Sequence, residues 1–277
     1  MHMKSVTFVL GLGFVLAGCP RQKEGDFTLG EATQALEESS MASQAEGLSA
    51  TSVDISTNFT IGQAVENAAA ELRTFVQSQL PCAEVMLDGA TLTVEYGVNA
   101  GNCTYRGHTF SGQTSITVAR NDMNQVEVHH AWTDFSNGNV TLNGTADVTW
   151  DFQALTRHVV HESTWTNKKG RIGEGSGDRT QSLLPGGLAE GIRVDGSRSW
   201  SGERGQWDLA IDGVEMRWAD PVPQAGSYTL NTPFNKTLSM SFSRVDEDTI
   251  RVLVAGPKKE FSFTVSKLGV VTNEGES

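Results

Sequence analysis

The sequence is short of basic residues and of long apolar runs. In 277 residues, 21 Lys and Arg stand against 33 Asp and Glu, a formal net charge of −12 at pH 7. An acidic surface repels phosphate groups, which argues against nucleic acid as a partner and against a polybasic grip on anionic lipid. The apolar run Val6–Val15 is shorter than the roughly 20 residues that cross a bilayer. Its length instead fits the core of a signal peptide.

The residues after this run resemble the lipobox of bacterial lipoproteins. Lys4 precedes the apolar core, and the core ends in Leu16-Ala17-Gly18-Cys19. The resemblance implies that residues 1–18 are a lipoprotein signal peptide, that signal peptidase II cuts before Cys19, and that the Cys19 thiol carries acyl chains such as palmitate. The alternative is an ordinary secretory signal that contains a cysteine.

The same resemblance implies a location. Two or three acyl chains anchor a protein stably to a membrane, whereas one chain gives only marginal binding. In lipoproteins an Asp after the cysteine favours retention in the inner membrane, and Pro20 stands there instead. We therefore expect a cell-envelope protein anchored through Cys19 in the outer membrane of a two-membrane bacterium. The sequence does not define the leaflet.

The sequence has only two further cysteines, and they are predicted to form a disulfide. Export places Cys82 and Cys103 in an oxidising compartment, where an even pair is most simply bonded. The enclosed loop of about 20 residues would stabilise the fold by roughly 3 kcal/mol. A zinc site is the alternative, but no His or further Cys stands at zinc-ligand spacing from either residue, and His108 is the nearest.

Two helices are predicted between Cys19 and the β region. Thr28 and Thr60 each precede a Glu or Gln by three residues, which is the capping-box pattern. Residues 58–81 are predicted to form an amphipathic helix, because apolar residues recur at steps of three and four until Pro81 ends the pattern. Residues 19–57 are interpreted as a tether with a weak helix, whose Glu- and Ser-rich part suggests a soluble spacer.

From Cys82 the apolar period changes from 3.6 to 2, which predicts antiparallel β structure over residues 82–268. Asp88-Gly89 is a strong hairpin signal. The expected fold class is mainly β, an antiparallel sheet or sandwich-like arrangement of about a dozen strands after one or two N-terminal helices. The alternating segments begin at Thr91, Gln125, Asn139, Arg157, Gln206, Lys236, Thr249 and Glu260.

Short phrases recur within the β region. Leu87-Asp88-Gly89 returns as Leu-Asn-Gly at 142–144 and as Ile-Asp-Gly at 211–213, and an aromatic residue follows each. The recurrence is compatible with two copies of a β unit, 82–165 and 190–268, and equally with a single domain.

The stretch Thr166–Arg179 is rich in glycine and charge and is expected to be a long flexible connection or a hairpin tip. Ser176 within it resembles a nucleophile between glycines, but Glu174 stands where a Gly is needed and no helix pattern follows. Its Gly-x-Gly also lacks the strand-to-helix context of a phosphate-binding loop. Residues 269–277 are expected to be a flexible tail.

The body of the chain also resembles uncharacterised lipoproteins of gliding, predatory soil bacteria. The resemblance runs through Phe59–Ala64 at the opening of the second helix, Pro81-Cys82 at the start of the β region, and Asp212–Trp218 at a strand end. These proteins carry no assigned activity, so the resemblance implies no functional residue.

The histidines do not form a metal site as they are spaced. His129 and His130 are neighbours in a strand, and His158 and His161 differ by three, so each pair points to opposite faces. Strand histidines that are exposed or hydrogen-bonded are the plainer interpretation. The acidic cluster Asp246–Asp248 is interpreted as a hairpin tip, with a calcium loop as the alternative. No metal, cofactor or catalytic residue is predicted.

Aromatic residues are the remaining lead, since all six tryptophans fall between Trp132 and Trp218. Alternation places Trp150 in the core. Trp200 has polar neighbours on both sides and the face of Trp165 is ambiguous, so both are candidates for a binding surface that meets a sugar or a partner protein. Covering the end of a sheet is the alternative role for such a tryptophan.

The sequence thus favours a lipid-anchored envelope protein that acts as a non-catalytic binding or assembly module on an envelope protein or glycan. Binding would use a sheet face, a free sheet edge or the 166–180 segment. One alternative is an extracytoplasmic hydrolase whose carboxylates or histidines are brought together by folding. Another is a purely structural lipoprotein.

Overall fold

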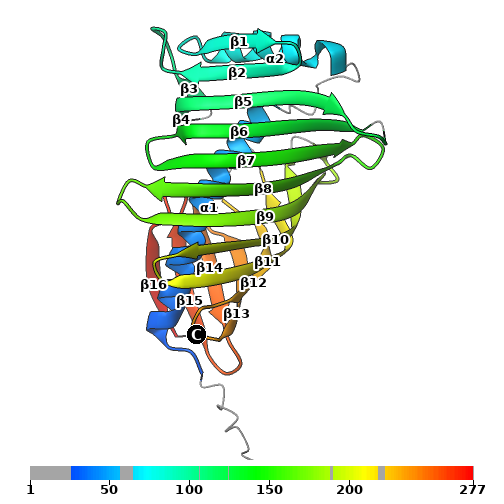
Figure 1. Ribbon diagram of the computed structural model, residues 1–277. Coiled ribbons are helices and arrows are strands. Elements are labelled where there is room, and N and C mark those ends of the chain that lie inside the picture. The colour runs from blue at the N-terminus through cyan, green and yellow to red at the C-terminus, as the bar shows by residue number, and fades with distance from the viewer. Residues whose placement is uncertain are drawn as a thin grey trace, which may run out of the picture.

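The computed structural model is mainly β, with two helices preceding one large antiparallel sheet (Figure 1). This confirms the fold class expected from the sequence. Fourteen strands form the large sheet, and β3 (Thr104–Tyr105) pairs with β4 (His108–Thr109) as a small separate one. The structure describes residues 26–56, 65–105, 107–123, 125–187, 190–217 and 222–276.

Each strand of the large sheet pairs with the next sheet strand along the chain, so successive connections lie alternately at the two ends of the strands. No crossover occurs in the part of the chain that is described. The strands are β1 (Glu84–Asp88), β2 (Thr91–Tyr96), β5 (Ser111–Arg120), β6 (Val126–Ser136), β7 (Val140–Asp151), β8 (Thr156–Asn167), β9 (Ile172–Leu183), β10 (Ile192–Gly202), β11 (Gly205–Met216), β12 (Ala225–Asn231), β13 (Thr237–Arg244), β14 (Thr249–Ala255), β15 (Glu260–Ser266) and β16 (Val271–Glu276).

The sheet curls around α1 (Leu29–Ser56), so that its middle and late strands lie on opposite sides of the helix (Figure 1). The helix contacts both β7 and β16. On one side the Trp132 Nε1–H donates to Ser52 Oγ at 2.9 Å, and on the other Lys236 Nζ lies 2.8 Å from Glu31 Oε2. A single sheet thereby makes a sandwich-like core with a helix as its middle layer.

The start of α1 has the predicted capping box. Thr28 Oγ1 accepts a hydrogen bond from the Glu31 N–H at 3.2 Å, and Glu31 Oε2 accepts one from the Thr28 N–H at 2.7 Å. The expectation of a weak helix followed by a soluble spacer is wrong, because α1 spans 28 residues inside the sheet. An enclosed helix needs no single apolar stripe, since several of its faces are buried. Its buried apolar residues include Ala32, Ala35, Ala42, Ala45, Leu48 and Val53.

The second helix, α2 (Val65–Gln79), ends just before Pro81 and packs against β1, β2 and β5. Its apolar stripe buries Leu72 and Val76, as the period of the sequence predicts. The predicted cap at Thr60 lies outside the described residues.

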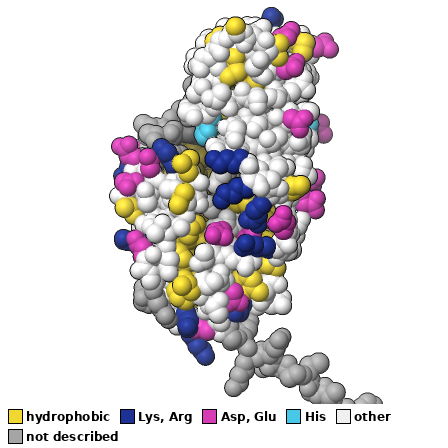
Figure 2. Space-filling model, turned by 90° about the vertical axis from the view of Figure 1, so that its left-hand side faces the viewer, with side chains coloured by type: hydrophobic (Ala, Val, Ile, Leu, Met, Phe, Trp, Pro, Cys, Tyr) yellow, Lys and Arg dark blue, Asp and Glu magenta, His cyan; other side chains and the backbone are white. Residues whose placement is uncertain are grey.

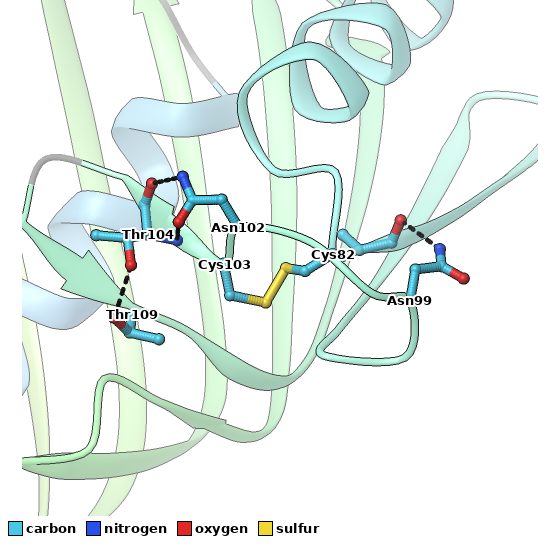
Figure 3. The surroundings of a disulfide bond; sticks show 7 residues. Cys82, Asn99, Asn102, Cys103, Thr104 and Thr109 are labelled. Atoms are coloured by element: carbon cyan, nitrogen blue, oxygen red, sulfur yellow. Dashed lines mark hydrogen bonds between the residues drawn. A yellow bond between two sulfur atoms is a disulfide. The ribbon is translucent and has the colours of Figure 1, made fainter.

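The predicted disulfide between Cys82 and Cys103 is present (Figure 3). It joins the segment after α2 to the loop that leads into β3, and the two Cα atoms lie 5.2 Å apart. Asn99 of the enclosed loop donates a side-chain hydrogen bond to the Ala83 carbonyl at 3.1 Å. The loop is therefore tied to the start of β1 at two neighbouring points.

Thr166–Arg179, expected to be a flexible connection or a hairpin tip, is a β hairpin, and the expected flexible tail is mostly a strand. Thr166–Arg179 includes the end of β8, a short turn and the first half of β9, and β9 pairs along its length with β8 and β10. Most of the expected tail, residues 269–277, forms β16, which pairs with β15. The sheet therefore continues between the two stretches considered as copies, 82–165 and 190–268, without dividing there.

The local turn predictions are confirmed. β1 and β2 join through Gly89-Ala90, directly after Asp88, and Gly89 has a φ of 57°, in the left-handed region that glycine adopts without strain. Asp246–Asp248 lie in the turn between β13 and β14. Within the described ranges, no helix is both long enough and apolar enough to cross a membrane.

Candidate functional site

A stripe of glycines runs along the inner face of β9. Gly173, Gly175 and Gly177 occupy alternate positions and so share one face of the strand. A Cβ at Gly173 would overlap the Trp165 ring, and one at Gly177 would overlap the His161 ring. The glycines therefore leave a trough that side chains from the neighbouring strands fill.

The register determines which side chains lie in this trough. His161 of β8 and Arg198 of β10 flank Gly177, and Trp200 of β10 pairs with Gly175. A Cβ at Gly175 would meet the backbone and Cβ of β10 at Ser199 and Trp200. Large polar and aromatic groups can therefore lie close to the β9 backbone, directly beneath α1.

The helix places Glu46 over the trough. Glu46 Oε2 lies 3.2 Å from His161 Nε2, and the other carboxylate oxygen contacts the Arg179 guanidinium. Burial alone would raise the pKa of Glu46, but the charges of Arg179 and His161, with a smaller effect of Arg198, outweigh it and hold the pKa well below its ordinary value. Glu46 is therefore a carboxylate in the folded protein and attaches α1 to β8 and β9.

Arg198 is the cation of this cluster without a carboxylate of its own. Its side chain is 6% exposed. Its Nη2 donates to Ser43 Oγ at 2.8 Å, and the guanidinium carbon lies 5.4 Å from the ring centroids of both Trp200 and Tyr228. Among the residues described, no carboxylate oxygen lies within ion-pair distance of Arg198. Nη2 also donates to the Ser39 carbonyl at 3.4 Å, so the charge of Arg198 is stabilised by a hydroxyl, a carbonyl and aromatic faces.

Two further acidic residues attach α1 to the sheet. Toward the end of the helix, Asp54 Oδ1 lies 2.6 Å from Nη2 of Arg157, a side chain that is 1% exposed. Toward its start, the buried Glu38 pairs with Arg171. Together with Glu46, these residues place ionic contacts along the whole helix. Breaking one partner of such a buried pair is costly, because the other charge is left without compensation.

A cavity of about 20 Å³ remains between α1 and the sheet at this cluster. That space can hold about one water-sized group. Its polar wall includes Glu46 and Ser49 from α1, His161 from β8, and Arg198 and Ser199 from β10. The rest of the wall is apolar and includes Ala42, Ala45, Trp165 and Trp200, so polar and apolar groups line the cavity about equally.

The Glu46–His161 pair is the acid–base half of a Ser–His–acid arrangement, and serines line the same cavity. In the described part of the chain, however, no serine hydroxyl bonds to His161, and the Oγ atoms of Ser176 and Ser199 lie 3.3 Å from each other. The Glu46 carboxylate also forms an ion pair with Arg179. The geometry suits the holding of a small polar group better than acyl transfer to a serine.

The two tryptophans expected to offer a binding surface are buried. Trp165 and Trp200 are 4% and 3% exposed, and both line the cavity beneath α1. Trp200 also stacks on Trp207, with ring centroids 6.1 Å apart. The expected exposure is therefore wrong, because the polar neighbours of Trp200 belong to a strand covered by a helix. Trp150 lies in the core, as alternation predicts.

The histidines are arranged as strand geometry predicts. His130 and His161 are buried and His129 and His158 are exposed, so each closely spaced pair points to opposite faces. The cross-strand combinations do not bring three metal-ligating side chains together within the described ranges. Of the four, only His161 lies in the charged cluster.

The sequence contains one signal of this site that was missed. Gly-x-Gly-x-Gly at 173–177 is itself a period-2 pattern, and it continues into Arg179 and Gln181 on the same face. Glu46 and Arg198 carry no comparable signal, because their proximity depends on the strand register and on where α1 lies. No protein-family model, curated protein or solved structure matches the chain.

Proposed function

We propose that the chain is a lipid-anchored protein of the cell envelope, held in the outer membrane by acyl chains on Cys19, and that it acts as a non-catalytic binding or assembly module. The observation that supports this most is the position of α1, the first described element after Cys19. Buried ionic contacts through Glu38, Glu46 and Asp54 fix that helix to the centre of the sheet. An anchor on Cys19 would be coupled directly to the folded core.

The link between Cys19 and the folded domain is short. The Asp26 carbonyl already accepts a hydrogen bond from Lys236 Nζ at 3.1 Å. Even fully extended, the seven residue-to-residue steps from Cys19 to Asp26 span at most about 25 Å. The long reach expected of residues 19–57 is therefore wrong, because α1 belongs to the core. The folded domain itself would therefore lie close to the membrane surface.

Basic side chains gather at the end of the sheet where α1 begins. The Phe27 ring lies 5.3 Å from that of Phe261 and fixes the start of the helix there. The turns after β8, β10, β12 and β14 lie at this same end, and Figure 2 shows a row of Lys and Arg side chains along this side. The basic residues in these turns are Lys168, Lys169, Arg171, Arg204, Lys236, Lys258 and Lys259.

The turns at the opposite end of the strands hold more acidic than basic residues. Their acidic residues are Asp122, Glu190, Asp246, Glu247 and Asp248, and two basic residues there, Arg217 and Lys267, pair with Glu190 and Asp248. The overall charge of −12 argues against contact with anionic lipid for the domain as a whole. Because the charge is distributed unevenly, anionic lipid would not repel the basic end. We infer that the basic end faces the headgroups. Acidic residues of α1 pair with several of these cations. Each remaining Lys near the membrane surface contributes about 1 kcal/mol of attraction to anionic headgroups. These charges would orient the domain, while the acyl chains would anchor it.

This orientation directs the acidic end away from the membrane. Asp246–Asp248 are exposed there, in the turn between β13 and β14. Charge complementarity favours a basic segment of an envelope protein over an acidic glycan as the partner. A hydrolase is the second candidate, because Glu46 and His161 lie beside serines, but the cavity of about 20 Å³ leaves no room for a substrate.

In-cell crosslinking followed by affinity purification from membranes tests the proposal, with wild type compared with Cys19→Ser. One stoichiometric partner that is lost in the variant is expected. Charge reversal of Asp246, Glu247 and Asp248 to Lys should lose the partner and keep the membrane location. The matched reversal of Lys168 and Lys169 to Glu should keep the partner. No enriched protein with any form would contradict a binding module and favour a purely structural lipoprotein.

A further inference from the structure

Three buried side chains that line the cavity beneath α1 each carry a polar atom without a hydrogen-bond partner. Among the residues described, these atoms are Nε of Arg198, Nε1 of Trp200 and Nδ1 of His161. All three side chains are at least nine-tenths buried. Oε1 of the less buried Glu46, on the same cavity, also has no hydrogen-bond partner in the described part of the chain but contacts the Arg179 guanidinium. Unsatisfied buried polar atoms are rare in folded proteins, and three on side chains that line one cavity favour a water or a bound ion there.

The charges around the cavity are unequal. The single carboxylate of Glu46 faces the guanidinium groups of Arg179 and Arg198. Arg179 takes one carboxylate oxygen and His161 the other, which leaves Arg198 with the Ser43 hydroxyl, the Ser39 carbonyl and aromatic faces. A buried charge without a direct counter-ion is expensive. A negative group in the cavity would supply the missing counter-ion.

The chemistry of two of the three free atoms favours an acceptor. The N–H groups of Arg198 and Trp200 can only donate. His161 presents its Nε2–H to the Glu46 carboxylate. Two guanidinium groups would repel a cation at this position. A neutral water could satisfy the donors but would leave the charge of Arg198 unbalanced.

We propose that this cavity binds a small monovalent anion of the halide class, with chloride as the expected occupant. A volume of about 20 Å³ suits a single compact ion. The ion would link Arg198 and Trp200 of β10 to His161 of β8 beneath α1. The ion would stabilise the packing of α1 against β8 and β10. The proposal does not depend on acylation of Cys19.

Thermal unfolding of the mature chain in sodium gluconate, with chloride or bromide added at constant ionic strength, tests the site. A saturable rise of a few degrees in the unfolding midpoint is expected, because a ligand that binds only the folded state stabilises it. Trp200→Phe removes the N–H and retains an aromatic ring, so it should weaken halide affinity about tenfold. Trp207→Phe is the matched control, since Trp207 stacks on Trp200 without lining the cavity, and its halide affinity should stay unchanged.

A crystal grown in bromide provides a second measurement that does not depend on any variant. An anomalous peak between Arg198, Trp200 and His161 is expected. A water peak there without anomalous signal would overturn the proposal, as would an unfolding midpoint that does not respond to halide. An equal halide response in Trp200→Phe and wild type would place the ion elsewhere and would equally overturn it.

Discussion

Gly177→Ala tests whether the glycine stripe creates the trough beneath α1. The added Cβ would overlap the His161 ring, so the ring must move. Overpacking of a filled core costs about 1–3 kcal/mol. Displacement of His161 also breaks its 3.2 Å contact with Glu46, and a lost charge-assisted hydrogen bond costs about 1.5–3 kcal/mol. We therefore expect Gly177→Ala to lower the free energy of unfolding by about 3–5 kcal/mol.

Urea unfolding followed by tryptophan fluorescence measures this loss, since Trp165 and Trp200 lie beside the site. Gly202→Ala is the matched control on β10, because a Cβ there makes only ordinary contact. It should gain about 0.5 kcal/mol from the lower entropy of the unfolded chain. In a His161→Ala background the cost of Gly177→Ala should fall below about 1 kcal/mol. An unchanged cost in that background, or a Gly177→Ala protein as stable as wild type, would refute the reasoning.

Three further predictions concern α1, a buried histidine and the disulfide. Gly47→Ala, at an exposed helical position with free space around it, should raise the free energy of unfolding by about 0.5–1 kcal/mol in urea titrations. Burial lowers the pKa of His130 to about 3. The unfolded chain binds a proton below pH 6.5 that the folded chain does not, so the free energy of unfolding should fall by up to about 5 kcal/mol between pH 6.5 and pH 3. His130→Gln should reduce this pH dependence, and an unchanged pH dependence would contradict the prediction. Replacing Cys82 and Cys103 by Ala should cost about 3 kcal/mol, and a thermal scan that finds no loss would show that the loop is already restrained.

The sequence predicts the parts of the fold that depend on local pattern. The capping box at Thr28, the stripe of α2, the hairpin at Asp88-Gly89 and most strands of the sheet follow from spacing alone. The Cys82–Cys103 pairing follows from the small number of cysteines and the expected compartment. These features need no knowledge of what lies across the core.

The sequence fails where a segment depends on partners far along the chain. The Glu- and Ser-rich part of α1 resembles a solvated spacer, yet Glu38 is buried because Arg171 lies opposite it. The glycines of β9 resemble a loop, yet they are needed because Trp165 and His161 lie across them. In both cases a polar or small residue is buried because of its partner, and only the register of the sheet reveals that partner.

The anchor on Cys19 is the claim on which the proposed function depends, and the intact mass of the protein extracted from membranes tests it most directly. The account predicts a chain that begins at Cys19, has lost residues 1–18 and carries the added mass of two or three acyl chains. The added mass should be absent from Cys19→Ser. A chain that retains residues 1–18, or one cut elsewhere without acyl mass, would contradict the anchor and with it the orientation of the basic end toward the membrane.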